Sequence, residues 1–461
     1  MSNLNGVSIL NNTFVQDTNT NWLKINNVCI GESSIYGYYT INSNGDIGGL
    51  LNTLSQDKNV TCVVYNWSNN TAYIKTGFNL SVQSDYKLTT GFTSFVLKSK
   101  IPIYYPSSIT PITPITPFVK WTSSQGNFML NGKNFVPVGF NAYWLGYTEQ
   151  YNYPTNVQID EMFNVAVKIN ATVIRSHTLG ISSGSSGSLR PYNNVLNNNA
   201  WKPIDYAFYK AKQTGIKLIC ALTDSYSWYN GSYGDFCKTR GIDKSKFWTD
   251  YNVRNDFKQY ISDWLNHTNS YTGVQIKNSP EIFSIELGNE IGNIRQDATS
   301  TTIPTQEWLT DISNYIKTLD NNHILMAGTD ECLGSTTSND FNINSIDMFS
   351  AHFYGQDYSR IDYGANKSSS IGKPYIIGEY SSQFQNDWFN NIEMRPNVKG
   401  TVAWSFYCHD NGLPTGNRVI HNDGFSVYGD NQDSKNTQQL LLLTNHFRRM
   451  RGLQAINQLY W

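Results

Sequence analysis

The chain has 461 residues, 15% of them charged, and a formal net charge of -1 at neutral pH. This length allows a large core and more than one domain, and the lack of a basic or acidic excess argues against nucleic acid and anionic membranes as partners. Aromatic residues make up 14% of the chain, with 12 Trp and 30 Tyr, which suits a protein that stacks rings on sugars. A chain that is merely rich in Tyr is the alternative.

The first part of the chain, residues 1–103, consists of short β-like runs with polar turns between them. The runs begin at Thr61, Thr71 and Thr93, and one helix is expected over Asp46–Gln56. This order resembles a PAN/apple module, although only Cys62 falls at a position where that family has a disulfide cysteine. An unrelated small β domain is the alternative. In either case we expect a module that binds carbohydrate or protein.

Residues 104–117 repeat Thr-Pro-Ile, a pattern typical of an extended, semi-rigid spacer with no core to bury. We therefore expect a linker there and a second domain over residues 118–461. The six cysteines form no Cys-x-x-Cys pair and no Cys/His cluster, so no metal site is expected. Cys220 lies inside an apolar run and is expected to be a buried free thiol.

The second domain alternates predicted strands with amphipathic helices. Among the helices, Ile204–Thr214 and Trp308–Leu319 each carry one apolar face. Eight alternations of this kind predict an α/β fold, the (β/α)8 TIM barrel, whose chemistry lies at the C-terminal ends of its strands. The predicted strands are Phe135–Asn141, Thr172–His177, Lys217–Thr223, Ile282–Asn289, Ile324–Gly328, Met348–Phe353, Tyr375–Glu379 and Gly400–Phe406.

Two of these strands run into a glutamate. One apolar run ends at Glu290 and the other ends at Glu379. A carboxylate at the mouth of a buried strand costs free energy unless it has partners or a function. Two such carboxylates that meet on one face are the minimum machinery for breaking a glycosidic bond.

Short motifs on successive strands resemble glycoside hydrolase family 5. Those at the first two strands, Gly139–Trp144 and Val173–His177, resemble its endo-β-mannanase branch. Each motif is weak alone, but together their order and spacing cover the whole barrel. The other motifs are Leu287–Glu290, His352–Tyr354, Gly378–Tyr380 and Ala403–Ser405.

The resemblance implies that Glu290 is the general acid/base and Glu379 the nucleophile of a retaining double displacement. The two carboxyl groups should then lie roughly 5–5.5 Å apart, with a covalent glycosyl-enzyme intermediate. An acid needs burial or a nearby like charge to keep its proton, whereas a nucleophile needs hydrogen-bond donors to stay ionised. We expect Arg175 and Tyr354 to be those donors.

The remaining candidate substrate-binding residues lie near the predicted strand ends. We expect Asn289 to bond the sugar 2-hydroxyl and Trp404 to form a platform under the reacting sugar, while His352 either touches the sugar or orients another group. Packing is the alternative for the predicted rim aromatics, which are Trp144, Trp228 and Trp388. His177 and Asp224 complete the set. Glu286 is expected to pair inside the barrel with Arg175 or a lysine.

Two features leave the specificity open. Ile291 and Gly292 follow Glu290 where many family members have proline, which makes the mannose preference less secure. The glycine-rich loop Ser182–Ser188 follows the second strand and is either a flap over the site or a surface loop.

The sequence thus predicts a modular retaining glycoside hydrolase, most simply a mannan endo-1,4-β-mannosidase, that acts on β-linked polysaccharide or oligosaccharide without a cofactor. Another β-glycanase or β-glycosidase, a silent carbohydrate-binding protein on a hydrolase scaffold, and an adhesion protein that works through its first module are the alternatives. We expect a monomer with no membrane span. We also expect a secreted enzyme, although the segment Met1–Gly6 lacks the pattern of a secretory signal.

Overall fold

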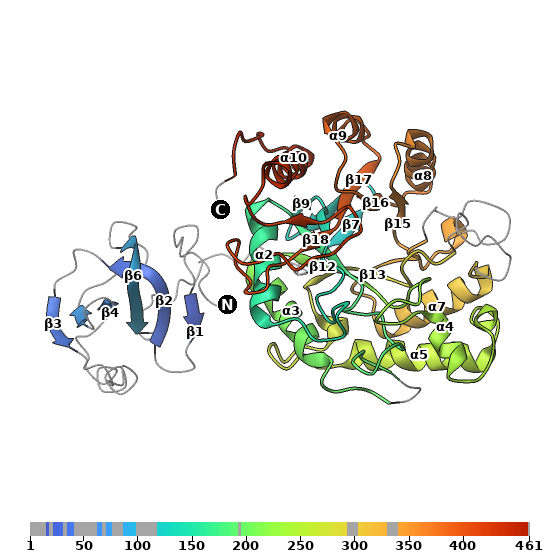
Figure 1. Ribbon diagram of the computed structural model, residues 1–461, viewed down its shortest axis with the longest axis horizontal. Coiled ribbons are helices and arrows are strands. Elements are labelled where there is room, and N and C mark those ends of the chain that lie inside the picture. Colours follow the sequence, from blue (N-terminus) through green and yellow to red (C-terminus); the bar gives the residue numbers. More distant parts are fainter. Residues whose placement is uncertain are drawn as a thin grey trace, which may run out of the picture. The chain divides into compact units, whose positions relative to one another are not determined.

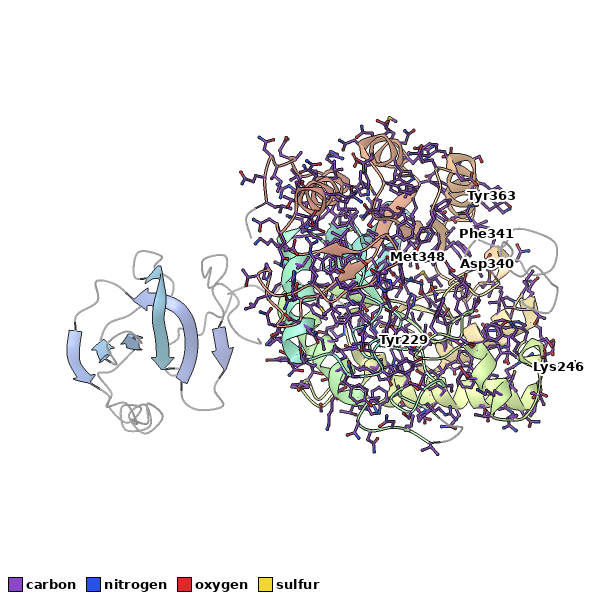
Figure 2. The ribbon with its side chains drawn as sticks, viewed as in Figure 1. Tyr229, Lys246, Asp340, Phe341, Met348 and Tyr363 are labelled. Atoms are coloured by element: carbon purple, nitrogen blue, oxygen red, sulfur yellow. The ribbon has the colours of Figure 1, made fainter. Side chains whose placement is uncertain are left out.

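The chain folds into two units, Met1–Thr113 and Pro114–Trp461. The computed structural model (Figure 1) describes residues 118–459 except 192–194, 293–302 and 330–339, and it describes six strands of the first unit. Side chains are described for the second unit alone (Figure 2). The predicted helix Asp46–Gln56 and the predicted spacer 104–117 lie outside the described residues.

The first unit contains an antiparallel sheet in the order β1-β2-β6-β4-β5-β3. Its β-rich character agrees with the sequence, since the predicted runs fall in β4, β5 and β6. The likeness to a PAN/apple module stays a prediction. The strands are β1 (Val15–Asp17), β2 (Trp22–Ile30), β3 (Ile35–Thr40), β4 (Cys62–Asn66), β5 (Thr71–Lys75) and β6 (Tyr86–Leu97).

The second unit is built on an eight-stranded parallel sheet in the order β14-β13-β12-β11-β10-β17-β16-β15. A single bridge between Met326 and Met348 joins its two outer strands, so the sheet forms a nearly closed barrel. The predicted TIM-like fold is confirmed. The strands are β10 (Val138–Asn141), β11 (Val173–Ser176), β12 (Lys217–Ala221), β13 (Ile282–Glu286), β14 (Ile324–Met326), β15 (Phe349–Phe353), β16 (Tyr375–Ser381) and β17 (Val398–Trp404).

Helices surround this barrel (Figure 1). Both predicted amphipathic helices form, and their apolar faces are buried against the strands. Thr155 begins α2 with a capping box to Gln158, which satisfies backbone donors of the first turn. No helix in the described part of the chain is both long and apolar enough to cross a bilayer. The helices are α2 (Asn156–Lys168), α3 (Trp201–Thr214), α4 (Tyr233–Lys238), α5 (Tyr251–Asn266), α7 (Gln306–Leu319), α8 (Tyr358–Ser370), α9 (Asn386–Glu393) and α10 (Ser434–Met450).

A small hairpin sheet covers the end of the barrel where the strands begin. It consists of β7 (Lys120–Thr122), β8 (Asn127–Leu130) and β9 (Lys133–Phe135). Phe128 of β8 packs edge-on against Phe283 of β13 at 5.1 Å, within a buried apolar cluster that also contains Val173. Because this end is filled with apolar side chains, polar chemistry is confined to the opposite end, where the strands finish.

The close pairing of β10 with β11 yields a stability prediction. A Cβ atom added at Gly139 would lie 1.8 Å from the Val173 carbonyl oxygen, so Gly139→Ala must displace backbone. We expect the free energy of unfolding of this unit to fall by about 1–3 kcal/mol or more, measured by urea denaturation. Gly355→Ala is the matched control, because nothing lies within 4 Å of its added Cβ. Equal stabilities for the two variants would contradict this account of the barrel.

Candidate active site

A cavity of about 340 Å³ lies where the barrel strands end. Eight of the eleven predicted site residues line it, and Arg175 and His352 lie behind its wall in contact with the two glutamates. Tyr229, which is labelled in Figure 2, belongs to the same lining. The full lining is Tyr143, Glu149, His177, Asp224, Tyr226, Trp228, Tyr229, Asn230, Asn289, Glu290, Tyr354, Glu379, Trp404, His421, Asp423 and Phe425.

The two glutamates meet inside this cavity. Glu379 lies within β16, and Glu290 follows the end of β13 with a φ of 50°, a left-handed value that is uncommon outside glycine. One carboxylate oxygen of each lies within 4.8 Å of the other. Strained backbone of this kind persists where the surrounding structure fixes it, and here it turns the Glu290 side chain toward Glu379.

Arg175 is the cation on which the site is assembled. It lies in β11 with no exposed surface, and its guanidinium contacts Glu286 at 2.8 Å and Glu379 at 2.9 Å. The same group donates to Asn141 at 2.9 Å and to Asn289 at 2.8 Å. A buried charge is tolerated only when it is paired and hydrogen-bonded in this way. The predicted pairing of Glu286 with Arg175 is confirmed.

Donors on two sides hold the Glu379 carboxylate. The Tyr354 hydroxyl donates to one oxygen at 2.5 Å, and Arg175 donates to the other. The net pKa of Glu379 lies above its ordinary value, because burial and repulsion from Glu290 outweigh the opposite effects of His352, Arg175 and Tyr354. Glu379 is therefore a buried carboxyl whose negative charge depends on these three neighbours.

His352 joins the two glutamates. Its Nδ1 lies 2.7 Å from Glu290 and 3.5 Å from Glu379, and the ring is 2% exposed. Burial opposes its charge, but Glu379 and Glu290 outweigh burial and raise the pKa of His352 to about 9. Of the two roles left open for this histidine, its burial and contacts favour orienting Glu290 over touching sugar.

The pKa of Glu290 is lowered, whereas a general acid that acts alone needs a raised pKa to keep its proton. Burial raises the pKa of Glu290. The hydrogen bond from His352 and the charge of His352 lower it by more, so the net pKa lies below the ordinary value. The same contact raises the pKa of His352, so His352 is the more basic group of the two. Because the two groups are in direct contact, they titrate as a pair rather than one at a time.

A second wall of the cavity is polar and comes from the ends of β11, β12 and β13. Asn289 accepts from Arg175 and donates to Asp224 at 3.1 Å, which fixes the orientation of its amide. His177 accepts from Arg175 at 2.9 Å, and burial together with Arg175 holds the pKa of His177 well below its ordinary value. Burial also raises the pKa of Asp224.

Aromatic rings form the rest of the cavity. The ring of Trp404, at the end of β17, stacks on Tyr143 at 4.7 Å with 14° between the planes. Trp228 is 67% exposed at the rim, as expected for an aromatic that can meet a chain of sugars. Tyr354 is 43% exposed and packs against Phe425.

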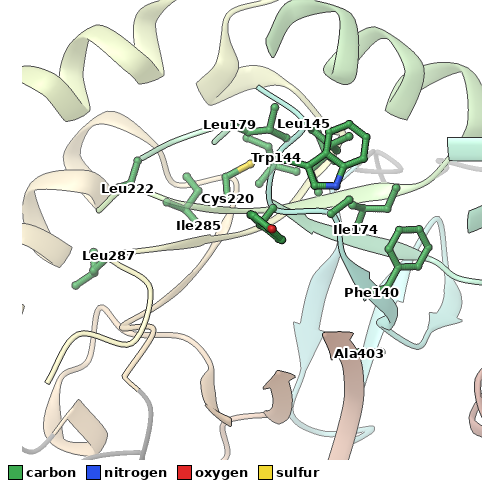
Figure 3. Close-up of a cluster of buried hydrophobic side chains, with 14 of the residues drawn as sticks. Phe140, Trp144, Leu145, Ile174, Leu179, Cys220, Leu222, Ile285, Leu287 and Ala403 are labelled. Atoms are coloured by element: carbon green, nitrogen blue, oxygen red, sulfur yellow. The ribbon is translucent and has the colours of Figure 1, made fainter. Parts of the chain in front are cut away.

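Trp144 corrects one expectation. It was predicted as a rim aromatic, but it is 1% exposed and belongs to the apolar core between the barrel and its helices (Figure 3). Its indole N–H donates to the Phe406 carbonyl at 3.1 Å. Trp388 is likewise fully buried. Both rings fill space between elements, so neither can contact substrate. Cys220 in the same core is a buried free thiol, as expected.

The glycine-rich loop Ser182–Ser188 is not a flap over the cavity. Ser182, Ser183 and Ser188 are buried, and a Cβ added at Gly187 would lie 2.3 Å from the Tyr147 hydroxyl. None of the loop's residues lines the cavity. Its glycines and serines allow close packing, which explains the composition without any motion.

Several residues that line the cavity were not among the predicted site residues. Tyr226 hydrogen-bonds Glu290 and lies two residues after Asp224, so the aromatic loop that contains Asp224 and Trp228 held a usable signal for it. His421 and Asp423 lie in a polar segment far from any strand end, where no periodic pattern exists.

Among the described residues, Glu290, His352 and Glu379 are the only group whose spacing would suit a metal ion. Their ligand atoms are already engaged. Glu379 pairs with Arg175, and the Nδ1 of His352 bonds Glu290. A cation would have to displace both interactions and approach a guanidinium, so the residues present do not fit a metal.

Comparison with known proteins agrees with this geometry. The chain is 28% identical over 303 residues to mannan endo-1,4-β-mannosidase 3 of Arabidopsis thaliana, which covers 63% of this chain and 69% of that protein. It is 27% identical over 363 residues to mannan endo-1,4-β-mannosidase 4 of Solanum lycopersicum, which covers 69% of this chain and 88% of that protein.

The fold is shared with solved structures as well. The endo-1,4-β-mannanase of Rhizomucor miehei superposes with a TM-score of 0.61 at 24% identity, over 73% of this chain and 99% of that one. Residues 117–377, more than half of the chain, match the model of the β-mannosidase-like group of glycoside hydrolase family 5. The chain therefore belongs to this family.

Proposed function

We propose that this chain is a retaining mannan endo-1,4-β-mannosidase in which Glu379 is the nucleophile and Glu290 the general acid/base. The spacing of the two carboxylates carries the proposal. Oxygens within 4.8 Å leave no room for the water that an inverting enzyme places between its carboxyl groups, which lie roughly 6.5–9.5 Å apart. The names of the relatives support mannan as the substrate.

In the first step the Glu379 carboxylate attacks the anomeric carbon and the bond to the leaving oxygen breaks. Arg175 and Tyr354 donate to Glu379, which favours its ionised form and fixes its orientation. The leaving oxygen takes a proton from Glu290. In the second step Glu290 accepts a proton from a water molecule, which attacks the same carbon and releases Glu379 with the configuration retained.

The contact between Glu290 and His352 explains where the proton for the leaving oxygen comes from. The pair shares one proton between His352 Nδ1 and a Glu290 oxygen 2.7 Å away, and the raised pKa of His352 favours the imidazole as its holder. As negative charge develops on the leaving oxygen, Glu290 passes a proton to it, and His352 supplies the pair's proton in return. Glu290 thus works as an acid even though its own pKa is lowered.

Two further groups favour the transition state over the ground state. Asn289 is locked by Arg175 and Asp224, so its amide can bond a sugar 2-hydroxyl without reorganisation. Trp404 offers an aromatic face beside the glutamates, and its indole N–H is fixed by Asp423 at 2.7 Å. Preorganised contacts of this kind raise the rate because binding energy does not go into ordering them.

We further propose that the unit Met1–Thr113 acts as a separate binding module of a monomeric, secreted enzyme. The Thr-Pro-Ile repeat after residue 104 supports a spacer, and a polymeric substrate supports action outside the cell. Gel filtration of the purified chain and detection of activity in culture medium test the last two points.

The roles of the two glutamates predict distinct defects. Glu379→Gln should abolish turnover without trapping an intermediate. Glu290→Ala should slow mannan hydrolysis by about 10²–10⁴-fold but affect activated aryl mannosides less, because good leaving groups need little protonation. Azide should rescue Glu290→Ala with retained configuration. Glu307→Gln, an exposed change on α7, is the control and should keep wild-type rates. Full activity in either cavity variant would refute the assignment.

The substrate proposal is tested by products. Incubation with β-mannans, β-glucans and xylans should yield manno-oligosaccharides from mannan, with internal cleavage seen as a rapid drop in viscosity. Proton NMR of the first product should show the β-anomer. Faster cleavage of β-glucan or xylan would overturn the mannan assignment, and an initial α-anomer would overturn the double displacement.

Removing residues 1–117 tests the module. The remaining chain should keep its turnover on soluble manno-oligosaccharides, whereas its retention on insoluble mannan should fall, because tethering raises the local concentration of enzyme. Retention equal to that of the full chain would remove a mannan-binding role from the first unit. Loss of activity on short substrates would show that the two units depend on each other.

A further inference from the structure

Three charged side chains in the cavity take no part in the bond-breaking steps, and of these only Asp423 has been given a role, through its bond to Trp404. Glu149 comes from the segment after β10, and His421 and Asp423 lie between β18 (Phe406–Tyr407) and β19 (Val427–Tyr428). Each is at least half buried, since their side chains are 31%, 13% and 21% exposed. Groups of this kind in a substrate cavity need partners to remain charged.

The two ring nitrogens of His421 each face a carboxylate, an arrangement that favours the imidazolium. Its Nδ1 lies 2.9 Å from a Glu149 oxygen, and its Nε2 lies 2.9 Å from an Asp423 oxygen. A neutral imidazole has one N–H and could satisfy only one of these carboxylates. Burial would lower the pKa of His421, but the bonds to Asp423 and Glu149 raise it to about 9. The same bonds lower the pKa of Glu149 and of Asp423.

Both carboxylates also hold the aromatic platform. The Asp423 oxygen that faces His421 accepts the Trp404 indole N–H at 2.7 Å. The second oxygen of Glu149 accepts the Tyr143 hydroxyl at 2.7 Å. Trp404 and Tyr143 stack on each other and form one aromatic platform in the cavity that also contains Glu379. His421 links the two rings through Asp423 and Glu149.

The other groups around His421 do not replace its bridge. The Tyr143 hydroxyl lies 3.0 Å from its Nδ1, and the Tyr407 ring stacks on it at 5.2 Å with 5° between the planes. On its outer side His421 borders a hollow lined by Arg418, Asp433 and Lys435. Arg418 is itself engaged by Asp433 at 2.6 Å and by Asp430 at 2.5 Å.

We propose that protonated His421 is a positioning residue, which bridges Glu149 and Asp423 and thereby holds Trp404 and Tyr143 in the orientation that receives the sugar. The role rests on the proposed glycosidase function. When His421 loses its proton, one ring nitrogen presents a lone pair to a carboxylate oxygen, and that contact becomes repulsive. Glu149 or Asp423 then moves away from His421, and the ring that it holds, Tyr143 or Trp404, is no longer fixed. Substrate turnover then falls through the loss of the platform, in addition to any loss of the proton that Glu290 and His352 share.

Glu149→Gln tests the bridge with little change in shape. Its amide oxygen can accept from His421 and its NH2 can donate to the Tyr143 hydroxyl, but one negative charge is lost. The pKa of His421 should fall by about 1–3 units, and the alkaline limb of kcat/KM on manno-oligosaccharides should move to lower pH accordingly. A limb that coincides with that of the wild type would overturn the proposal.

Glu393→Gln is the matched control, since Glu393 contacts His446 at 2.7 Å on the outside of the barrel. Its limb should stay in place. His421→Gln should reduce kcat/KM by up to about 100-fold even at pH 6, because misplaced contacts remote from the chemistry can cost that much. A pH-independent loss below twofold in His421→Gln would count against a positioning role.

A second measurement does not depend on catalysis. In the full chain labelled with 15N at histidine and tryptophan, the Trp404 indole resonance, assigned with Trp404→Phe, should shift with the same midpoint as the His421 ring. An indole resonance that ignores this titration would overturn the coupling. If the wild-type chain cleaves no glycan, the proposed function fails, while this titration still decides whether His421 controls Trp404.

Discussion

The buried guanidinium of Arg175 is the constraint on which fold and site both depend. It pairs with Glu286 inside the barrel and with Glu379 in the cavity, and it orients the amide of Asn289. Removing one partner of a buried pair typically costs 3–5 kcal/mol, because the other charge is left uncompensated. Four β-strands therefore have their polar ends set by one side chain, and the catalytic geometry cannot be separated from the packing of the barrel.

Strand ends were the part of the site that sequence could predict. An apolar run that stops at an acid identifies a carboxylate at the catalytic face, and this found Glu290 and Glu379 because the barrel gathers its strand ends in one place. That Glu286 would need a cation inside the barrel followed from strand alternation, but the choice of Arg175 over a lysine did not. The fold class followed from the alternation of strands and helices.

Other features could not be read from the pattern. Trp144 and Trp228 both follow predicted strands and could not be told apart in the sequence. Trp144 fills the core, whereas Trp228 is 67% exposed, because the path of each loop decides which ring faces solvent. His421 meets Glu149 across 272 positions of the chain, a contact that no local period encodes. The lowered pKa of Glu290 depends on its distances to His352, Tyr226 and Arg175, and sequence gives no distances.

The barrel is paired less completely between β14 and β15 than between its other neighbouring strands. Its ladder runs without interruption from β14 through β17 to β15. Among the described residues, β14 is joined to the segment just before β15 by one bridge, between Met326 and Met348, and by the backbone bonds from Asp347 and Met348 to Leu325. β15 therefore has a full strand partner, β16, on one side only, and it contains His352. Local opening follows the weakest backbone pairing, so amide exchange is expected to enter the barrel here first. His352 therefore lies on a strand that borders the one interrupted junction of the described barrel.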